Sequence, residues 1–382
     1  MTLPVFDSLD AARRRRSAKW RTHPADVLPM FVAEMDVALA PQVQQVLSDA
    51  VAASDTGYAM ALPDLAEALA GFTQRRWGWP VDPAQVSPVP DVGVGMVEVL
   101  RLLGAGGRAV VFSTPVYPPF WHWVAEVGAR AVEVPLDRAE DGSFRLDLAA
   151  LERAFAQRPA AYLLCNPHNP VGRVPEAGEL AALVELGARY GVPLVSDEIH
   201  APLVLPGEAC TPLLTVPGAA EGALALVSAS KAFNLAGLKC AAVVSASPRM
   251  SAVLRRMPED VRWRTGHLGV LASIAAFTDG DAWLDGLRAA LADRFDLLGT
   301  LLAEQLPAVR WQRPQATYLA WLDCRAVGEG EEPTRRFLQR GRVAVEPGPK
   351  FGAPGSGFVR LNVGTSTELL TEGVTRMAAA LG

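Results

Sequence analysis

The residues with the most specific chemistry in this sequence stand at the ends of apolar runs that predict buried strands. Lys231 follows the run 223–227, and hydroxyl groups flank it at Ser228 and Ser230. A lysine ammonium is costly to bury. Lys231 is therefore either an amine that joins covalently to an aldehyde cofactor, with hydroxyl donors ready for a phosphate, or a strand-end lysine whose alkyl stem reaches solvent.

Three further residues of this kind favour the first interpretation. Asp197 ends the run 192–197, Asn169 follows the run 160–165 in an Asn-Pro turn, and Arg360 lies inside the apolar run 358–363. An amide, an acid, a lysine and an arginine in such places match a pyridoxal 5'-phosphate (PLP) site.

Each residue type has a reason in the chemistry of PLP. The cofactor is an electron sink whose power depends on a protonated pyridine nitrogen, and a buried carboxylate such as Asp197 keeps that nitrogen protonated. The amide of Asn169 can donate to the phenolic oxygen. Lys231 can hold the cofactor and later move protons at the substrate Cα, and the planar fork of Arg360 suits the substrate α-carboxylate.

Ordered motifs along nearly the whole chain carry a resemblance to a known family. They are Lys19-Trp20, the segment 29–36, Thr56-Gly57-Tyr58, the segments 114–120, 196–200, 228–234, 237–239 and 317–323, and the stretch from Glu346-Pro347-Gly348 to 360–364. With these motifs the chain resembles the fold-type I PLP-dependent enzymes of the aminotransferase class I/II superfamily. Within it, the chain is similar to the MalY/PatB-type cystathionine β-lyases, the C–S lyase branch.

One position favours the lyase branch. His200 stands where many aminotransferases of the superfamily have a tyrosine that bonds the phenolic oxygen, and the C–S lyases have histidine there. Two departures leave the choice of substrate open. The loop 90–95 is richer in glycine than is usual for the branch, and Thr365 replaces a cysteine often found after the arginine motif.

The resemblance also points to contacts with the cofactor phosphate. The loop 91–95, expected before the first strand of the cofactor domain, opens into an apolar helix over 96–103, so the amides of Val92 and Gly93 could cradle a phosphate at a helix N-terminus. Lys239 stands where relatives have a cation against the phosphate, although a solvated lysine would look the same in sequence.

Two aromatic residues complete the expected site. Tyr117 is placed to stack on the cofactor ring, with ordinary packing at a helix start as the alternative. Tyr58 matches a tyrosine that reaches the phosphate of the neighbouring subunit in relatives. The resemblance thus implies a homodimer with active sites shared across its interface.

The alternation of apolar runs and helical patterns predicts an α/β fold. Buried strands are expected at 108–113, 129–136, 160–165, 193–196, 223–227 and 241–245, with helical patterns such as 175–190 between them. This predicts a doubly wound, mostly parallel sheet that binds its ligand at the carboxyl ends of the strands. A helical stretch from 249 to 306 and strands at 317–322 and 358–363 predict a smaller α+β C-terminal domain. The expected division is 1–41 for an N-terminal segment packing on the small domain, 42–280 for the large PLP-binding domain, and 281–382 for the small domain.

Composition excludes several other classes. A net charge of −5 and a pI near 5.7 argue against nucleic acid or an anionic membrane as the main partner. The run 13–16 of four arginines is expected to be a solvated face on a short helix, with a binding patch as the alternative. Residues 1–10 lack the pattern of a signal peptide, and no apolar span is long enough for a membrane helix. Scattered cysteines suit a reducing cytoplasm, and the histidines show no metal-ligand spacing.

The function expected from these features is β-elimination of L-cystathionine or another cysteine S-conjugate to a thiol, pyruvate and ammonia. An aminotransferase acting on a small amino acid could use the same residues, and a regulatory role through protein contacts is a third reading. The pocket walls are expected at 34–36, 117–123 and 263–267. Aromatic residues there (Phe120, Trp121 and Trp263) would favour a bulky apolar S-substituent, with core packing as the alternative role for at least one of them.

Overall fold

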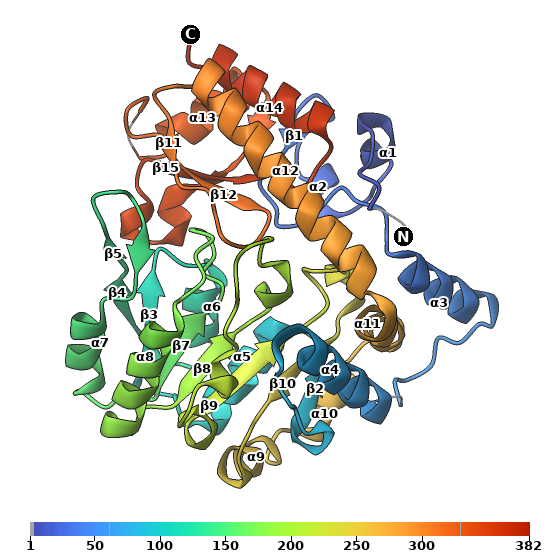
Figure 1. Cartoon of the computed structure of the whole chain (residues 1–382), viewed down its shortest axis with the longest axis vertical. Helices are drawn as coiled ribbons and strands as arrows, with labels where there is room; N and C mark the ends of the chain where they lie inside the picture. The colour runs from blue at the N-terminus through green and yellow to red at the C-terminus, as the bar shows by residue number, and fades with distance from the viewer. Residues whose placement is uncertain (1–3, 61, 329) are drawn as a thin grey trace.

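A central sheet organises the larger part of the chain in the computed structural model, which describes residues 4–60, 62–328 and 330–382 (Figure 1). Among these residues seven strands form the sheet, in the order β2 (Val86–Val89), β10 (Ala241–Val244), β9 (Ala223–Val227), β8 (Leu194–Asp197), β7 (Ala161–Cys165), β3 (Ala109–Thr114) and β4 (Arg130–Pro135). The strands from β9 to β4 run parallel, and β10 is antiparallel to both neighbours. The predicted α/β fold with a mostly parallel sheet is confirmed.

Helices cover both faces of this sheet because its strands alternate their side chains between two apolar cores. On β3, Val110 and Phe112 belong to one core, whereas Val111 belongs to the other. The first core takes in α5 (Val92–Leu102), α6 (Pro119–Glu126), α9 (Pro248–Leu254) and α10 (Glu259–Trp263). The second takes in α7 (Leu148–Phe155), α8 (Ala177–Tyr190) and α11 (His267–Asp279).

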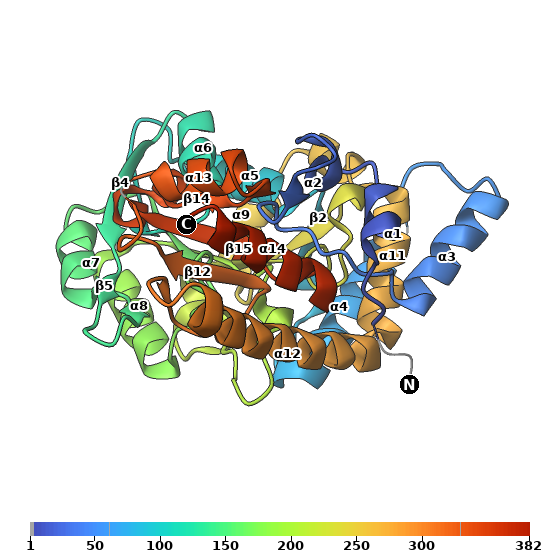
Figure 2. The same ribbon diagram turned by 90° about the horizontal axis from the view of Figure 1, so that it is seen from above.

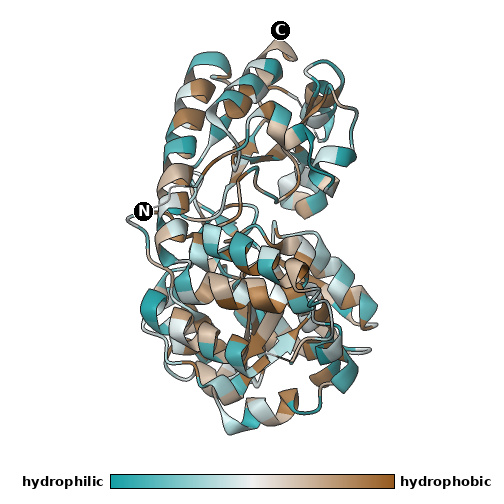
Figure 3. Ribbon diagram, turned by 90° about the vertical axis from the view of Figure 1, so that its right-hand side faces the viewer, coloured by the Kyte–Doolittle hydropathy of each residue, from teal (hydrophilic) through white to brown (hydrophobic). Residues whose placement is uncertain are grey.

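A smaller sheet lies above the first in Figure 1, drawn in orange to red. Its four described strands are antiparallel, in the order β11 (Arg310–Trp311), β12 (Leu319–Asp323), β15 (Phe358–Asn362) and β14 (Glu346–Pro347). The long helix α12 (Asp281–Gln305) packs with α14 (Thr367–Ala379), and α13 (Glu332–Gln339) lies nearby. Figure 3 shows the two parts as separate lobes with the brown apolar strands inside each.

The N-terminal segment, dark blue in Figure 2, contacts both lobes, since Leu28 pairs with Val343 of the small one and the amide of Met35 donates to Asn234 Oδ1 of the large one. It contains α1 (Leu9–Arg13), α2 (Ala18–Arg21) and β1 (Leu28–Pro29), and β1 pairs in parallel with β13 (Val343–Ala344). After it, α3 (Pro41–Ala52) and α4 (Leu62–Trp77) pack on α11, and a hairpin of β5 (Asp137–Arg138) and β6 (Phe144–Arg145) extends from the large sheet. Residues 1–3 lie outside the described residues. They begin both the expected N-terminal segment and the stretch 1–10, in which the sequence shows no signal-peptide pattern. We propose the boundaries 1–41, 42–280 and 281–382 for the segment and the two domains.

Three details differ from the sequence expectations. The strand expected to be buried at 129–136 is β4, an edge strand with Arg130 and Glu133 exposed, because it pairs only with β3. The opposite edge strand, β2, was not predicted, since Pro88 within it lowers strand propensity and is tolerated at an edge. The helix expected from 96 begins instead at Val92, and it follows a strand rather than preceding the first one.

The arginine run is not uniformly a solvated face. Arg13 ends α1, but the side chain of Arg15 folds inward, where its Nε contacts Asp7 Oδ2 at 2.7 Å. Its Nη2 donates to the carbonyl oxygen of Val37 at 2.7 Å. Arg15 therefore links two parts of the N-terminal segment, around Asp7 and Val37, instead of facing solvent.

Candidate active site

Lys231 lies just beyond the carboxyl end of β9, in a short turn that follows Ser228 and Ser230. Its Nζ donates to the carbonyl oxygen of Ala33 at 2.8 Å. Burial, and then the positive charge of Arg360, lower the pKa of Lys231 to about 8, while Asp197 opposes the shift. At pH 7 roughly a tenth of the molecules therefore carry the neutral amine, far more than for an ordinary lysine, and the neutral amine is the form that attacks a carbonyl.

Asp197 ends β8, the neighbouring parallel strand, and so reaches the same edge of the sheet. Its carboxylate is buried and accepts one hydrogen bond, from the amide of Ile199 at 3.2 Å. Burial raises the pKa of Asp197 to about 6, against the pull of that hydrogen bond and of Lys231. A buried carboxylate with so few donors is available to a cationic partner.

His200 is buried three residues later, in a T-shaped contact with the ring of Tyr318, 6.2 Å between centroids. Burial, followed by the charges of Lys231 and Arg360, lowers the pKa of His200 well below its usual value, so the ring is neutral. Its Nδ1 is buried and has no hydrogen-bond partner among the described residues. Such an atom needs a partner that the chain itself does not supply.

Arg360 comes from β15 of the small sheet and points to the turn after β7 in the large one. Its Nη1 donates to Asn169 Oδ1 at 3.1 Å and its Nη2 to the carbonyl oxygen of Phe31 at 3.0 Å. The guanidinium lies over the ring of Phe351, 4.9 Å from its centroid. Its buried Nε has no partner in the described part of the chain. The two hydrogen bonds therefore fix the position of the guanidinium, and its Nε–H is left free to donate to a ligand.

The N-terminus of α5 forms another wall. Asp91 caps the helix by accepting from the amide of Val94 at 2.8 Å, and for the preceding amides of Val92 and Gly93 the described residues provide no acceptor. A Cβ on Gly93 would lie only 3.0 Å from Trp123 Nε1, so the lack of a side chain lets the helix end lie close to Trp123. These two amides and the helix dipole favour an anion here.

Lys239 stands beside the same helix end. Its Nζ pairs with Asp91 Oδ2 at 3.0 Å, and its side chain is 57% exposed. Its backbone is left-handed, with φ of 60°. The cation is therefore within reach of the helix N-terminus but is not enclosed by protein.

Two adjoining cavities bring these residues together. The inner cavity, of about 230 Å³, is lined by Ala33, Asp91, Val92, Gly93, Tyr117, Pro119, Trp123, Cys165, Asn169, Asp197, Ile199, His200, Ser230, Lys231, Ala236 and Lys239. The outer cavity, of about 760 Å³, is lined by Val32, Ala33, Tyr117, Pro118, Pro119, Trp121, His122, Glu133, Lys231, Glu346, Pro349, Lys350, Phe351, Gly352 and Arg360. Ala33, Tyr117, Pro119 and Lys231 line both cavities and so mark the passage between them.

Two predicted site residues lie outside both cavities. Ser228 Oγ is 2.6 Å from Ser230 Oγ and donates to the carbonyl oxygen of Cys240 at 2.7 Å, so it orients Ser230 from behind. Tyr58 is 79% exposed and meets the ring of Trp263 edge-on, 5.7 Å between centroids. Within one chain Tyr58 does not reach the other site residues.

The expected pocket walls are partly wrong. Val32 and Ala33 line the outer cavity in place of 34–36, and neither cavity has a described lining residue from 263–267. Trp121 lines the outer cavity as expected, whereas Phe120 is buried in the apolar core. Sequence reasoning assigned no role to Glu346 or Lys350, because their position depends on how β14 pairs with β15. The available signals were the motif that contains Glu346 and the i, i+4 spacing of the two residues.

The segment that carries Ala33 is held tightly over Lys231. Tyr318 also donates to the carbonyl oxygen of Ala33, at 2.9 Å. Further along the segment, Asp36 forms a buried ion pair with Lys19 at 2.8 Å. Removing one partner of such a pair leaves a buried charge. These contacts hold the segment around Ala33, which lines both cavities, in one position.

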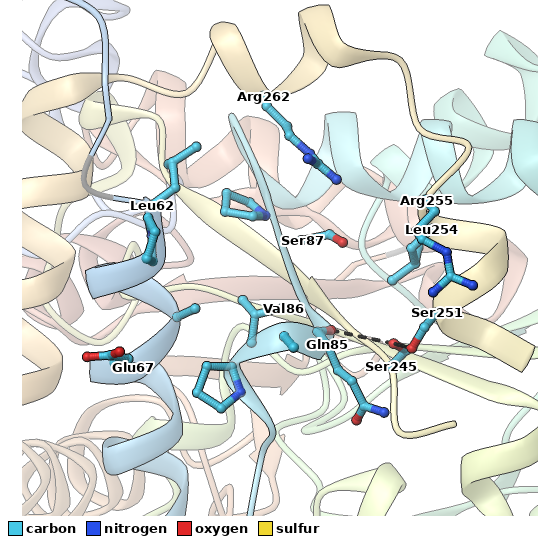
Figure 4. A pocket seen from close by; sticks show the side chains of 15 residues that line it. Leu62, Glu67, Gln85, Val86, Ser87, Ser245, Ser251, Leu254, Arg255 and Arg262 are labelled. Carbon is cyan, nitrogen blue, oxygen red and sulfur yellow. Dashed lines mark hydrogen bonds between the residues drawn. The ribbon is translucent and has the colours of Figure 1, made fainter. Parts of the chain in front are cut away.

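Figure 4 shows a different cavity, of about 450 Å³, between α4, β2 and the helices α9 and α10. The described residues that line it include none of the predicted site residues. Within the described ranges no group of three His, Cys, Asp or Glu side chains could hold a metal ion. No helix in the described parts of the chain is both long and apolar enough to cross a membrane.

Comparisons with known proteins agree with this geometry. A Mycobacterium leprae protein, named provisionally as a cystathionine beta-lyase, is 47% identical over 98% of this chain and 97% of its own. Cystathionine beta-lyase PatB of Bacillus subtilis is 34% identical over 98% of this chain and 99% of its own. A crystal structure from Corynebacterium diphtheriae, described provisionally as a PLP-dependent beta-cystathionase, superposes with a TM-score of 0.92 at 34% identity, covering 98% of each chain.

The family model described as "Aminotransferase class I and II" matches residues 35–377, which include both cavities except for their Val32 and Ala33 edge. The chain therefore belongs to the aminotransferase class I and II family.

Proposed function

We propose that this protein is a PLP-dependent carbon–sulfur β-lyase that acts on cysteine S-conjugates. The reaction takes one S-conjugate and one water and yields a thiol, pyruvate and ammonia. The single observation that carries the proposal is the meeting of an inner and an outer cavity at Lys231, because one can hold the cofactor while the other receives the leaving thiol.

The residues of the inner cavity fit PLP. In the inner cavity the buried Nδ1 of His200 has no partner in the described chain, and Asp197 is an acceptor with a single donor. Val92 and Gly93 offer free amides at the other end of the same cavity. A ligand with a ring nitrogen at one side and an anionic group at the other satisfies both ends.

We assign the holding residues accordingly. Lys231 would bind the aldehyde carbon, Asp197 the pyridine nitrogen, and Asn169 and His200 the side of the phenolic oxygen. The amides of Val92 and Gly93, Ser230 and Lys239 would hold the phosphate, with Ser228 positioning Ser230. Tyr117 would lie against the ring. When bound, PLP supplies the electron sink for breaking bonds at the substrate Cα.

The chain's own residues supply binding and proton transfer. Arg360 binds the α-carboxylate through its planar fork and so aims the Cα–H bond at Lys231. With its pKa lowered to about 8, Lys231 can accept the Cα proton and pass it on to the departing group. Tyr117, at the passage, keeps bulk water from the reacting atoms.

Two features favour elimination over amino transfer. The relatives that match nearly the full chain carry the names of cystathionine beta-lyases. The outer cavity, of about 760 Å³, lies directly beyond Lys231 and is large enough for a departing thiol with a substantial substituent.

We further propose that the enzyme is a homodimer of the cytoplasm. Tyr58 and Trp263 are large exposed side chains in contact with each other. In the proposed dimer a second copy covers them, and Tyr58 is the residue that we propose to reach the phosphate end of the partner's site. The four cysteines in the described chain are free thiols, as suits a reducing compartment.

Product analysis of the PLP-loaded protein tests the function. With L-cystathionine or S-propyl-L-cysteine as substrate, we expect pyruvate, ammonia and thiol in equal amounts, and none of them from Lys231→Ala. A keto acid that keeps its sulfur, formed only when an amino acceptor is present, would assign the protein to the aminotransferases and refute the proposal.

A further inference from the structure

The outer cavity is not purely apolar, because charged side chains share its mostly apolar wall. Beside Trp121 and Phe351, and in addition to Tyr117, Lys231 and Arg360, four charged or titratable side chains line it, namely His122, Glu133, Glu346 and Lys350. Glu133 is engaged, because its Oε1 accepts from Trp121 Nε1 at 2.9 Å. The pair of Glu346 and Lys350 remains to be explained.

Glu346 lies next to Arg360 for a structural reason. The two residues are register partners in the antiparallel pairing of β14 with β15, so their side chains leave the sheet on the same face. The Glu346 side chain is only 14% exposed. A carboxylate therefore stands beside the guanidinium that is proposed to bind the substrate α-carboxylate.

Lys350 follows four residues later in the 3-10 helix η6 (Gly348–Phe351), and its Nζ contacts Glu346 Oε1 at 2.7 Å. No other described residue donates a hydrogen bond to the carboxylate of Glu346. The exposed ammonium of Lys350 likewise has donors to spare, since three hydrogens meet one acceptor. Each member of the pair can take a second partner without losing the first.

The two charges have opposite effects on a substrate. Glu346 alone would repel an α-carboxylate at Arg360, and the nearby Lys350 offsets that repulsion. An exposed i, i+4 ion pair adds little stability by itself. Where such a pair lines a cavity, it presents one anionic and one cationic group to whatever enters.

Building on the proposed lyase function, we propose that Glu346 and Lys350 are specificity-determining residues that bind the amino-acid end of the leaving thiol. Glu346 accepts from its ammonium and Lys350 donates to its carboxylate. The preferred substrates are then cysteine S-conjugates whose thiol part is itself zwitterionic, as in L-cystathionine. S-alkyl cysteines share the Arg360 contact but lack this second contact.

The test compares two substrates in the PLP-loaded enzyme. We would measure kcat and KM for L-cystathionine and for S-propyl-L-cysteine in the wild type, Glu346→Gln and Lys350→Met. The expected result is a fall of about 10-fold or more in kcat/KM for L-cystathionine, chiefly through KM, since each variant removes a hydrogen bond to a charged group. S-propyl-L-cysteine feels only the effect of the changed charge on Arg360 and lacks the second contact, so its kcat/KM should change several-fold less than that of L-cystathionine in each variant.

Glu372→Gln is the matched control, because it breaks an i, i+4 pair with Arg376 of similar length, 2.6 Å, on α14 away from both cavities. It should change neither substrate's kinetics. Equal changes for both substrates in Glu346→Gln and Lys350→Met, or no change for L-cystathionine, would overturn the inference. Failure of the wild type to release thiol from either substrate would instead refute the proposed lyase function, so the two failures are distinguishable.

Discussion

Arg360 Nη1 donates a hydrogen bond to Asn169 Oδ1 at 3.1 Å, although the two residues are 191 positions apart and come from different sheets. The bond ties β15 of the small sheet to the turn after β7 in the large sheet. It leaves the amide nitrogen of Asn169 available on the side of the inner cavity. The proposed contacts with substrate and cofactor are therefore mechanically linked.

Replacing Arg360 by lysine should weaken substrate binding. A lysine offers a point charge instead of a planar fork, and it leaves Asn169 Oδ1 or the Phe31 carbonyl without a donor. Steady-state kinetics should show kcat/KM lower by about 10- to 150-fold, mostly through KM. Arg342→Lys is the control, since it alters a two-point contact with Asp26 on the surface. Similar KM values in both variants would contradict the assignment.

Attachment of PLP to the cofactor-free protein should depend on pH through Lys231. The neutral amine is the reactive form, and its pKa is lowered to about 8, so the rate of attachment should rise with pH and level off above that value. Arg360→Gln removes the second cause of the shift, and the profile should then move to higher pH. Stopped-flow absorbance measures the rate, and a midpoint near that of an ordinary lysine in the wild type would contradict the account.

Glycine at position 93 should be required for tight cofactor binding. A Cβ there would crowd Trp123 Nε1 at 3.0 Å and Asp91 Oδ1 at 3.3 Å, which forces the helix cap to shift. Gly93→Ala should weaken PLP affinity, measured by fluorescence titration, by about 10-fold, the equivalent of one lost hydrogen bond. Gly178→Ala, where a Cβ meets open space on α8, should leave the affinity unchanged and stabilise the fold by up to about 1 kcal/mol. Equal PLP affinities in Gly93→Ala and Gly178→Ala would show that the close contact between position 93 and Trp123 has no role in cofactor binding.

Glu198, buried behind Asp197, should make the cofactor-free protein sensitive to pH. Burial raises its pKa to about 7 from an ordinary value of 4.5, so the folded state holds the proton more tightly than the unfolded state. The free energy of unfolding, relative to Glu198→Gln, should therefore fall as pH rises from about 4.5 to 7, by an amount on the order of 3 kcal/mol. Urea denaturation measures it. Exposed Glu304→Gln is the control, and a constant difference between wild type and Glu198→Gln over this range would contradict the prediction.

Sharing of sites in a homodimer predicts complementation between inactive chains. Neither Tyr58→Ala nor Lys231→Ala dimers should have a complete site, but a hybrid dimer has one, which combines Lys231 of one chain with Tyr58 of the other. After refolding an equal mixture, roughly a quarter of the wild-type sites should be active if chains pair at random. Activity no greater than that of the separate variants would exclude a shared site.

The sequence predicts the inner cavity well because parallel strands end at one edge of a sheet. Asn169, Asp197 and Lys231 each follow an apolar run, and three adjacent strands, β7, β8 and β9, bring them together. Such local signals need no knowledge of distant contacts. Arg360 was also expected in a strand, although the sequence alone did not indicate which turn it would face.

The outer cavity was less predictable because it depends on pairing between distant segments. The register of β14 with β15 sets Glu346 beside Arg360, and no periodicity within either short strand encodes that register. The start of α5 was missed for a different reason. Its first turn contains two glycines, which have low helix propensity and therefore suggested a loop. The side chain of Asp91 stabilises that turn by accepting a hydrogen bond from the amide of Val94.

The most direct test of the account is to find where PLP is attached. Borohydride reduction of the PLP-loaded enzyme, followed by proteolysis and mass spectrometry, makes the linkage permanent and locates it. The account predicts the phosphopyridoxyl group on the peptide that contains Lys231 and on no other. A label on Lys239, or none on Lys231 in protein that releases thiol from cysteine S-conjugates, would contradict it.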